Sequence, residues 1–120
     1  MRRVPAWAWL AGIVVASFLF RWWIARGMVG PFIMVDELIY SELARSLADG
    51  DGLQIRDQPS GVVSVLYPLL IAPAYLLYDS LPDAYAAVKV INAALMSSAA
   101  IPAYFLARRA LAPGLSLFAA

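Results

Sequence analysis

The chain has 120 residues, of which 63% are hydrophobic and only 14% are charged, and its mean hydropathy is +0.76. A composition this apolar excludes an ordinary soluble domain and indicates a membrane protein. The net charge of +1 and the lack of a basic tract predict no nucleic-acid partner, and the absence of cysteine and histidine excludes disulfides, thiolate metal sites and a histidine base. Acid–base chemistry in this chain must therefore use carboxylates, tyrosine or lysine.

The first apolar run covers residues 4–24 and is long enough to cross about 30 Å of hydrocarbon as a helix. Trp7 and Trp9 lie near its start and Trp22 and Trp23 near its end, as in the aromatic belts of transmembrane helices. A basic head before an apolar core is also typical of a cleaved signal peptide. No small-residue cleavage motif follows the core, so the pattern favours a retained membrane anchor.

Residues 25–61 form a polar loop, and residues 34–52 within it hold five of the eight acids. We predict an amphipathic helix over 36–49, with Asp36 as its N-cap and glycine at its C-terminal end. Asp36, Tyr40, Leu43 and Leu47 share one side of this helix at 100° per residue, whereas Leu38 is the one apolar residue on the polar side. At roughly 18 Å, such a helix is too short to cross a bilayer and suits its surface.

The remainder alternates between apolar runs and turns. Residues 62–78 form a short apolar segment with two prolines, which is either re-entrant or transmembrane, and residues 79–83 are a polar turn. Residues 84–106 form a second predicted transmembrane helix, which Pro102 is expected to kink near its end. Residues 115–120 resemble the start of a further span, so we expect the chain to be the N-terminal part of a longer protein.

Charge predicts the topology. Between the two long apolar runs lie all eight acids and only three basic residues, which gives this region a net charge of −5. The pairs Arg2–Arg3 and Arg108–Arg109 lie beyond the two runs, and the positive-inside rule places both pairs in the cytoplasm. The first loop is then extracytoplasmic and an even number of crossings separates the pairs, so residues 62–78 do not cross. If they do cross, Arg108–Arg109 faces outward against the rule.

The order of these segments resembles a known family. The polar helix has the form DExxYxxxARxLxxGxG, and PLLIAPAYLLY and YFLARRAL follow in the later apolar segments. Together they resemble the N-terminal part of a GT-C-type glycosyltransferase that uses polyprenyl-phosphate sugars, the superfamily of protein O-mannosyltransferases and lipid A aminoarabinose transferases. The resemblance covers nearly all 120 residues, but complete members are several times longer, so this chain alone is not expected to be active.

The resemblance implies roles for individual residues. Asp36 matches the family's first-loop aspartate, which acts as the base or orients the acceptor, and Glu37 matches a second carboxylate. Tyr40 matches a family aromatic, although a packing role also fits it. The donor would be a polyprenyl-phosphate-linked sugar, and the acceptor a lipid, a glycan or a protein.

One stretch departs from the family pattern. Relatives often carry Glu-Lys or His before Pro-Pro after this loop, whereas residues 57–61 here contain neither lysine nor histidine. Arg56 is the nearest cation for the phosphate, with a solvated surface arginine as the alternative. Lys89 matches an arginine at the outer end of a span and either faces lipid phosphate or extends to the interface. No cofactor is predicted with certainty, because the adjacent carboxylates Asp36 and Glu37 suit a divalent cation but make a poor site alone.

The sequence therefore predicts an all-α, polytopic cell-membrane protein that belongs to a glycosyltransferase acting at the extracytoplasmic face. The alternative is a non-enzymatic membrane protein, such as a transporter or an assembly subunit, with the amphipathic helix as an interfacial strut. A transporter is expected to hold its polar groups near the middle of the membrane on broken helices. The acids here lie in a surface loop, which favours the enzyme.

Overall fold

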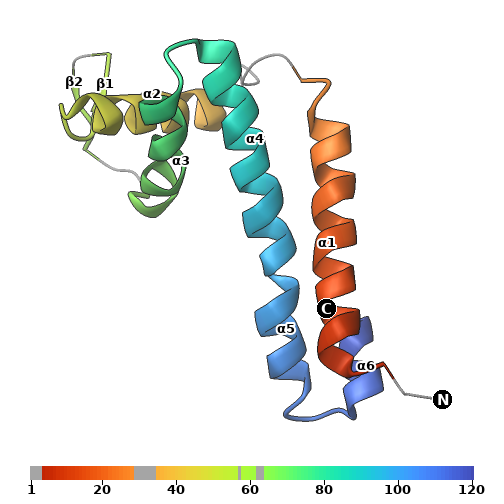
Figure 1. The fold of residues 1–120 in the computed structure, drawn as a ribbon. Helices are drawn as coiled ribbons and strands as arrows, with labels where there is room; N and C mark the ends of the chain where they lie inside the picture. The colour runs from red at the N-terminus through yellow and green to blue at the C-terminus, as the bar shows by residue number, and fades with distance from the viewer. Residues whose placement is uncertain (1–3, 29–34, 57, 62–63) are drawn as a thin grey trace. The chain divides into compact units, whose positions relative to one another are not determined.

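The computed structural model describes residues 4–28, 35–56, 58–61 and 64–120, and these are mostly helical (Figure 1). The helices are α1 (Ala6–Ala25), α2 (Val35–Asp49), α3 (Leu66–Leu77), α4 (Leu81–Ser98), α5 (Ala100–Ala107) and α6 (Pro113–Phe118). The two-residue strands β1 (Gln54–Ile55) and β2 (Gln58–Pro59) pair antiparallel. The predicted mainly helical chain is confirmed. Arg2–Arg3, Asp57 and the first two residues of the 62–78 segment lie outside the described residues.

The chain divides into two compact units. Unit 1 comprises Met1–Ala25 and Asn92–Ala120, and unit 2 comprises Arg26–Ile91, so that α4 contributes its first half to unit 2 and its second half to unit 1. In unit 1, α1 lies alongside α5 and α6, and α1 and α5 run in opposite directions (Figure 1). Their contact buries the residues Leu10, Ala100 and Tyr104.

A small polar contact joins α1 to the second half of α4. The Ser97 hydroxyl donates a hydrogen bond to Ser17 Oγ at 3.1 Å, and Ser97 is only 2% exposed. One turn further along α1, Arg21 Nε donates to Ser17 Oγ at 3.3 Å. In an apolar surrounding, hydroxyl pairs of this kind hold two helices in register.

Within the described residues, two helical stretches are long and apolar enough to cross a membrane. They are Ala6–Ala25, which is α1, and Leu81–Ala107, which contains α4 and α5. Only 6% and 22% of their most apolar windows are buried within the protein. The core helix of a soluble protein would be mostly buried, so these exposed apolar surfaces fit a lipid environment better than water.

The second predicted span begins earlier than expected, and its helix is interrupted near its end, as expected from Pro102. α4 begins at Leu81 rather than at residue 84, because Ser80 caps it: the Asp83 N–H donates to Ser80 Oγ at 3.3 Å, and the Ser80 hydroxyl bonds the Asp83 carboxylate in return. The predicted turn over 79–83 is therefore wrong for its last three residues. The helix is interrupted at Ala99, between α4 and α5. Pro102 has no N–H to donate to the Ser98 carbonyl, which explains the interruption.

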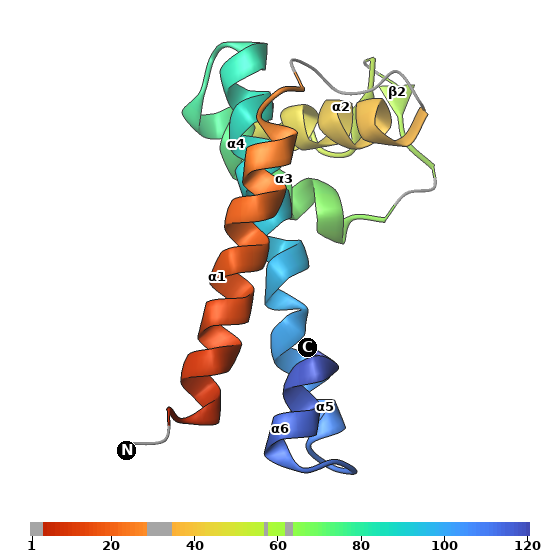
Figure 2. The same cartoon turned by 90° about the vertical axis from the view of Figure 1, so that its right-hand side faces the viewer.

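Unit 2 is built on the packing of α2 against α3, which lie side by side in both views (Figures 1 and 2). Leu43 is fully buried on α2, and Ala44 beside it joins a core with small and aliphatic residues of α3 and the first half of α4. The buried members of this core are Ala44, Ile71, Ala72, Ala74, Tyr85 and Val88. Alanines at the contact let the helix backbones approach closely.

α3 covers only part of the apolar segment predicted over 62–78. Its 12 residues give a length of about 18 Å, well short of the ~30 Å hydrocarbon core. Pro68 lies in its first turn, and Pro73 lies inside the helix. Because α3 is this short, its length favours a re-entrant segment over 62–78 rather than one that crosses the membrane. At the other end of the chain, α6 occupies part of the region expected to begin a further span.

A topology experiment tests this arrangement of spans. Reporters fused after Gly52 and after Asp79 should lie on the same, extracytoplasmic, side, because α3 is too short to carry the chain across. A reporter fused after Arg109 should be cytoplasmic. Paired alkaline phosphatase and green fluorescent protein fusions at each position measure this directly. Opposite sides for Gly52 and Asp79 would make the α3 segment a true span.

The hydroxyl pair in unit 1 gives a second prediction. Ser97→Ala removes the bond to Ser17 and should lower the free energy of unfolding by about 0.6–1.7 kcal/mol, the range for such bonds between membrane helices. Ser98→Ala is the matched control, because the exposed Ser98 hydroxyl donates only to Leu95 O within its own helix. Unfolding by sodium dodecyl sulfate in mixed micelles measures both variants, and equal losses would show that the Ser97 contact adds nothing.

Candidate functional site

The acid pair lies at the N-terminal end of α2. The helix begins at Val35, one residue before the predicted start, so Asp36 and Glu37 lie in its first turn and the prediction that Asp36 is the N-cap is wrong. Both side chains are exposed. The unpaired N–H groups of the first turn carry a partial positive charge, which stabilises carboxylates there. The position that the sequence predicted for catalysis is therefore accessible.

The apolar side of α2 is as predicted. Tyr40 and Leu47 pack on the core of unit 2, and Leu43 and Ala44 are fully buried. The Tyr40 ring meets the Tyr67 ring of α3 edge-on, with 5.3 Å between centroids and an angle of 85° between the rings. This geometry is favourable for an aromatic pair and supports a packing role for Tyr40.

The two glycines of the motif end the helix. Gly50 and Gly52 have φ angles of 88° and 81°, which side chains rarely adopt. Gly50 N–H donates to Leu47 O at 3.2 Å and Asp51 N–H donates to Ser46 O at 3.0 Å, which is the pair of bonds in a Schellman cap. The cap reverses the chain and leads it into β1.

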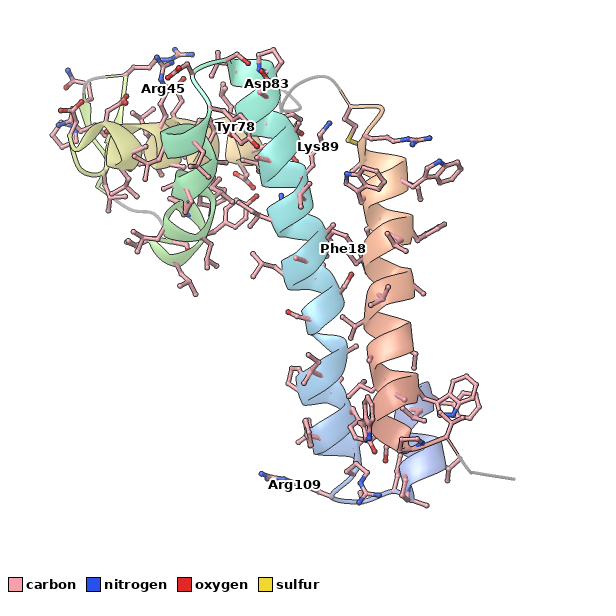
Figure 3. All side chains as sticks on the ribbon, viewed as in Figure 1. Phe18, Arg45, Tyr78, Asp83, Lys89 and Arg109 are labelled. Carbon is pink, nitrogen blue, oxygen red and sulfur yellow. The ribbon has the colours of Figure 1, made fainter. Side chains whose placement is uncertain are left out.

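Lys89 lies on α4 within unit 2 (Figure 3). Its Nζ donates to Met28 O at 2.5 Å and lies 5.4 Å from the centre of the Tyr85 ring. The Glu37 carboxylate acts electrostatically on the Tyr85 hydroxyl. Glu37 and Lys89, both predicted site residues, therefore have Tyr85 as a common neighbour. Within the protein, Lys89 contacts the Met28 carbonyl and the Tyr85 ring, and the two alternatives given for it, lipid phosphate or the membrane interface, stay predictions.

Arg56 lies apart from Glu37 and Lys89. It is exposed in the loop between β1 and β2, with a φ of 50°. With Asp49 and Asp51 it lines a groove at the C-terminal end of α2. Asp49 is twelve residues beyond Glu37, or about 18 Å along the helix. The predicted site residues thus fall into two places, with Asp36, Glu37 and Lys89 toward one end of unit 2 and Arg56 toward the other.

A small cavity opens on the predicted polar side of α2, and we call it the aromatic cavity. Its volume is 110 Å³, and its lining comes from α2, α3 and the start of α4: Leu38, Ser41, Glu42, Arg45, Tyr75, Leu81 and Tyr85. Burial raises the pKa of the Tyr75 hydroxyl, and its hydrogen bond with Ser41 opposes this only in part. Tyr75 is therefore neutral at physiological pH and serves as a hydrogen-bonding group rather than as a base.

A second hollow, the polar groove, continues from the cavity toward the hairpin. Its volume is 270 Å³, and it is lined by Glu42, Arg45, Ser46, Asp49, Asp51, Gln54 and Arg56. Arg45 Nε lies 3.9 Å from Asp49 Oδ2, and both side chains are more than half exposed (Figure 3). The Ser46 hydroxyl oxygen is buried and has no hydrogen-bond partner within the described residues. Glu42 and Arg45 line both hollows and join them.

These hollows were not predicted from the sequence. The one signal was Leu38, which stands on the polar side of α2 as an exception to its pattern. The structure explains it, because Leu38 helps to line the aromatic cavity. An apolar residue one turn before Glu42 thus indicated that this side also packs against something.

For a metal, the described residues offer no group of three or more acidic side chains that could hold an ion. Asp36 and Glu37 alone would give a metal ion only two side-chain ligands. Comparisons of the chain with protein-family models, with curated proteins and with solved structures gave no significant match. The function must therefore be argued from the residues themselves.

The Schellman cap predicts that replacing glycine by alanine changes the free energy of unfolding in opposite directions at Gly50 and at Gly12. Gly50→Ala should lower the free energy of unfolding by about 1–2 kcal/mol, because no atom crowds the position but the left-handed backbone strains any side chain. Gly12→Ala, inside α1 and equally uncrowded, should instead be neutral or stabilise by up to about 1 kcal/mol through helix propensity. Denaturant titrations of the two variants compare them, and equal effects would contradict the conformational explanation.

Proposed function

We propose that the chain forms part of a GT-C-type glycosyltransferase, which moves a sugar from a polyprenyl-phosphate carrier to an acceptor at the extracytoplasmic face of the membrane. The observation that carries the proposal is the exposed acid pair in the first turn of α2, in the segment between two candidate membrane-spanning helices. The proposal also rests on the resemblance of the α2 pattern to that superfamily.

The fold supports the proposal by accounting for the uncharged positions of the motif. Its aromatic, alanine and leucine positions are occupied by Tyr40, Ala44 and Leu47, which pack on the core, and its glycines form the cap. Packing and capping therefore explain these five positions. They do not explain the three charged positions of the motif, Asp36, Glu37 and Arg45, whose side chains are exposed. Charged side chains left over in this way are candidates for chemistry.

In the proposed reaction, bonds form and break between the acceptor, the sugar and the phosphate, and the protein takes up only a proton. The acceptor hydroxyl oxygen attacks the anomeric carbon, and the bond from this carbon to the phosphate oxygen breaks with its electron pair going to the phosphate. The Asp36 carboxylate takes the proton of the attacking hydroxyl, a contribution worth roughly 10²–10⁴-fold in rate. Attack opposite the leaving phosphate inverts the anomeric centre.

Glu37 and the cationic residues have supporting roles in this proposal. Glu37 orients the acceptor beside Asp36, and the positive end of α2 offsets the two adjacent charges. The departing phosphate requires a positive partner. Lys89 lies 5.4 Å from the centre of the Tyr85 ring, and Glu37 acts electrostatically on the hydroxyl of the same tyrosine, so we assign Lys89 this role in preference to Arg56.

Asp36→Asn tests the catalytic role of Asp36. Asparagine keeps the shape of the side chain but cannot take a proton, so sugar transfer should fall by roughly 10²–10⁴-fold. The loss of charge at the helix end should cost no more than about 1 kcal/mol of stability. The measurement is transfer from undecaprenyl-phosphate mannose, glucose and aminoarabinose to membrane acceptors by the full-length protein in nanodiscs, normalised to folded protein.

Asp79→Asn is the matched control, because Asp79 is an exposed acid of unit 2 outside both hollows. It should transfer sugar at the wild-type rate. Near-normal transfer by Asp36→Asn would remove the catalytic assignment. No transfer by the wild-type protein from any donor would instead favour the non-enzymatic alternative, in which α2 is an interfacial strut.

A further inference from the structure

We infer that the aromatic cavity and the polar groove together bind a neutral saccharide. The binding is argued from the two hollows themselves. The further statement that this saccharide is the acceptor, which makes the acceptor a glycan rather than a lipid or a protein, rests on the proposed function.

The charges of the polar groove favour a neutral ligand. Its lining holds three carboxylates and two guanidinium groups, so it carries a net charge of −1. A phosphate would meet more negative than positive groups, and the described residues contain no cluster of acids that could hold a metal ion. A polyhydroxylated ligand matches both kinds of side chain, because each hydroxyl donates to a carboxylate and accepts from a guanidinium.

The hydroxyl of Ser46 also supports a hydroxyl-bearing ligand in the polar groove. Its oxygen is buried without a partner among the described residues, and Ser46 lines the polar groove. A buried polar atom without a hydrogen bond costs about 1–3 kcal/mol, so native structures rarely keep one without a reason. A ligand hydroxyl in the groove would supply the missing hydrogen bond.

The aromatic cavity provides the apolar part of the site. Tyr75 and Tyr85 line it together with Leu38 and Leu81, and Glu42 and Arg45 connect it to the groove. A sugar ring has apolar C–H faces as well as hydroxyls, and tyrosine offers both an aromatic surface and a hydrogen-bonding group. A hollow that changes from aromatic to polar along its length therefore suits a short saccharide.

The two hollows extend along α2 away from its N-terminal end. Leu38 is two residues beyond Asp36, which is about 3 Å along the helix axis but about 160° around it, so the aromatic cavity opens on the other side of the helix from Asp36. The groove then continues away from Asp36 as far as Asp49. A saccharide bound across both hollows would thus lie along α2 with its far end directed toward the hairpin, and its identification as the acceptor rests on the proposed function alone.

Binding is measured by saturation-transfer NMR and by titration on the purified protein in nanodiscs. The saccharide probes are methyl α-mannoside, methyl β-glucoside, methyl β-galactoside, N-acetylglucosamine and their disaccharides. Inorganic phosphate and a serine-containing octapeptide are the competing probes. We expect at least one saccharide to bind and the other two classes not to bind. Binding of phosphate or peptide without any saccharide would overturn the inference.

Two variants and one control locate the binding. Glu42→Gln keeps the shape of the side chain but removes the carboxylate shared by the two hollows, and it should weaken saccharide binding by about tenfold or more. Asp79→Asn should leave binding unchanged. Ser46→Ala should weaken binding and at the same time raise the midpoint of thermal unfolding, because it removes the unpaired hydroxyl. A more stable Ser46→Ala with unchanged binding would reduce Ser46 to a packing defect and count against the site.

Different experimental results would contradict this inference and the proposed function. Asp36→Asn should bind saccharide as the wild type does while losing transfer. Saccharide binding that depends on Glu42, in a protein that transfers no sugar, would support the site and overturn the glycosyltransferase. Sugar transfer that is insensitive to Glu42→Gln, without saccharide binding, would support the enzyme and overturn the glycan site.

Discussion

The contact between α2 and α3 is the interaction on which the arrangement of unit 2 depends. Leu43 and Ala44 are fully buried on one side of α2, and the alanines of α3 allow the two helices to lie close together. Fully burying a leucine contributes about 1.5–3 kcal/mol, which fixes the rotation of α2 about its own axis. Once that rotation is fixed, the exposed acids of the first turn, the aromatic cavity and the polar groove all take their places. Their positions follow from a core to which none of the candidate catalytic side chains contributes.

The helices illustrate what periodicity predicts. Tyr40, Leu43 and Leu47 fall on one side of α2 at helical spacing, and the glycines after Asp49 mark its end, so both its buried side and its C-terminus follow from the sequence. Its start was displaced by one residue, because a carboxylate is favourable in the first turn of a helix as well as at its N-cap. The start of α4 was missed by three residues, since Pro82 suggested a turn although Ser80 and Asp83 form a capping pair.

The two hollows show why the rest was not predictable. The aromatic cavity brings Ser41 and Glu42 of α2 to Tyr75 of α3 and Tyr85 of α4, residues more than thirty positions apart in the chain. Such contacts depend on the packing of three helices, and no local pattern encodes them. The same holds for Lys89, whose partner is the backbone carbonyl of Met28. No side-chain pattern in the sequence indicates a contact with a backbone oxygen, so this partner of Lys89 could not be predicted.

The bond between Lys89 and Met28 also bears on biosynthesis. It joins positions 61 residues apart, and Tyr85 and Val88 of the same helix complete the core around Ala44. During translation, α2 is therefore complete 36 residues before Tyr85 is added, whereas α3 ends only eight residues before it. The acid pair and both hollows take their final form only after the ribosome has passed residue 91. Until then the half-built core exposes apolar surface, which the membrane interface or a chaperone must shield.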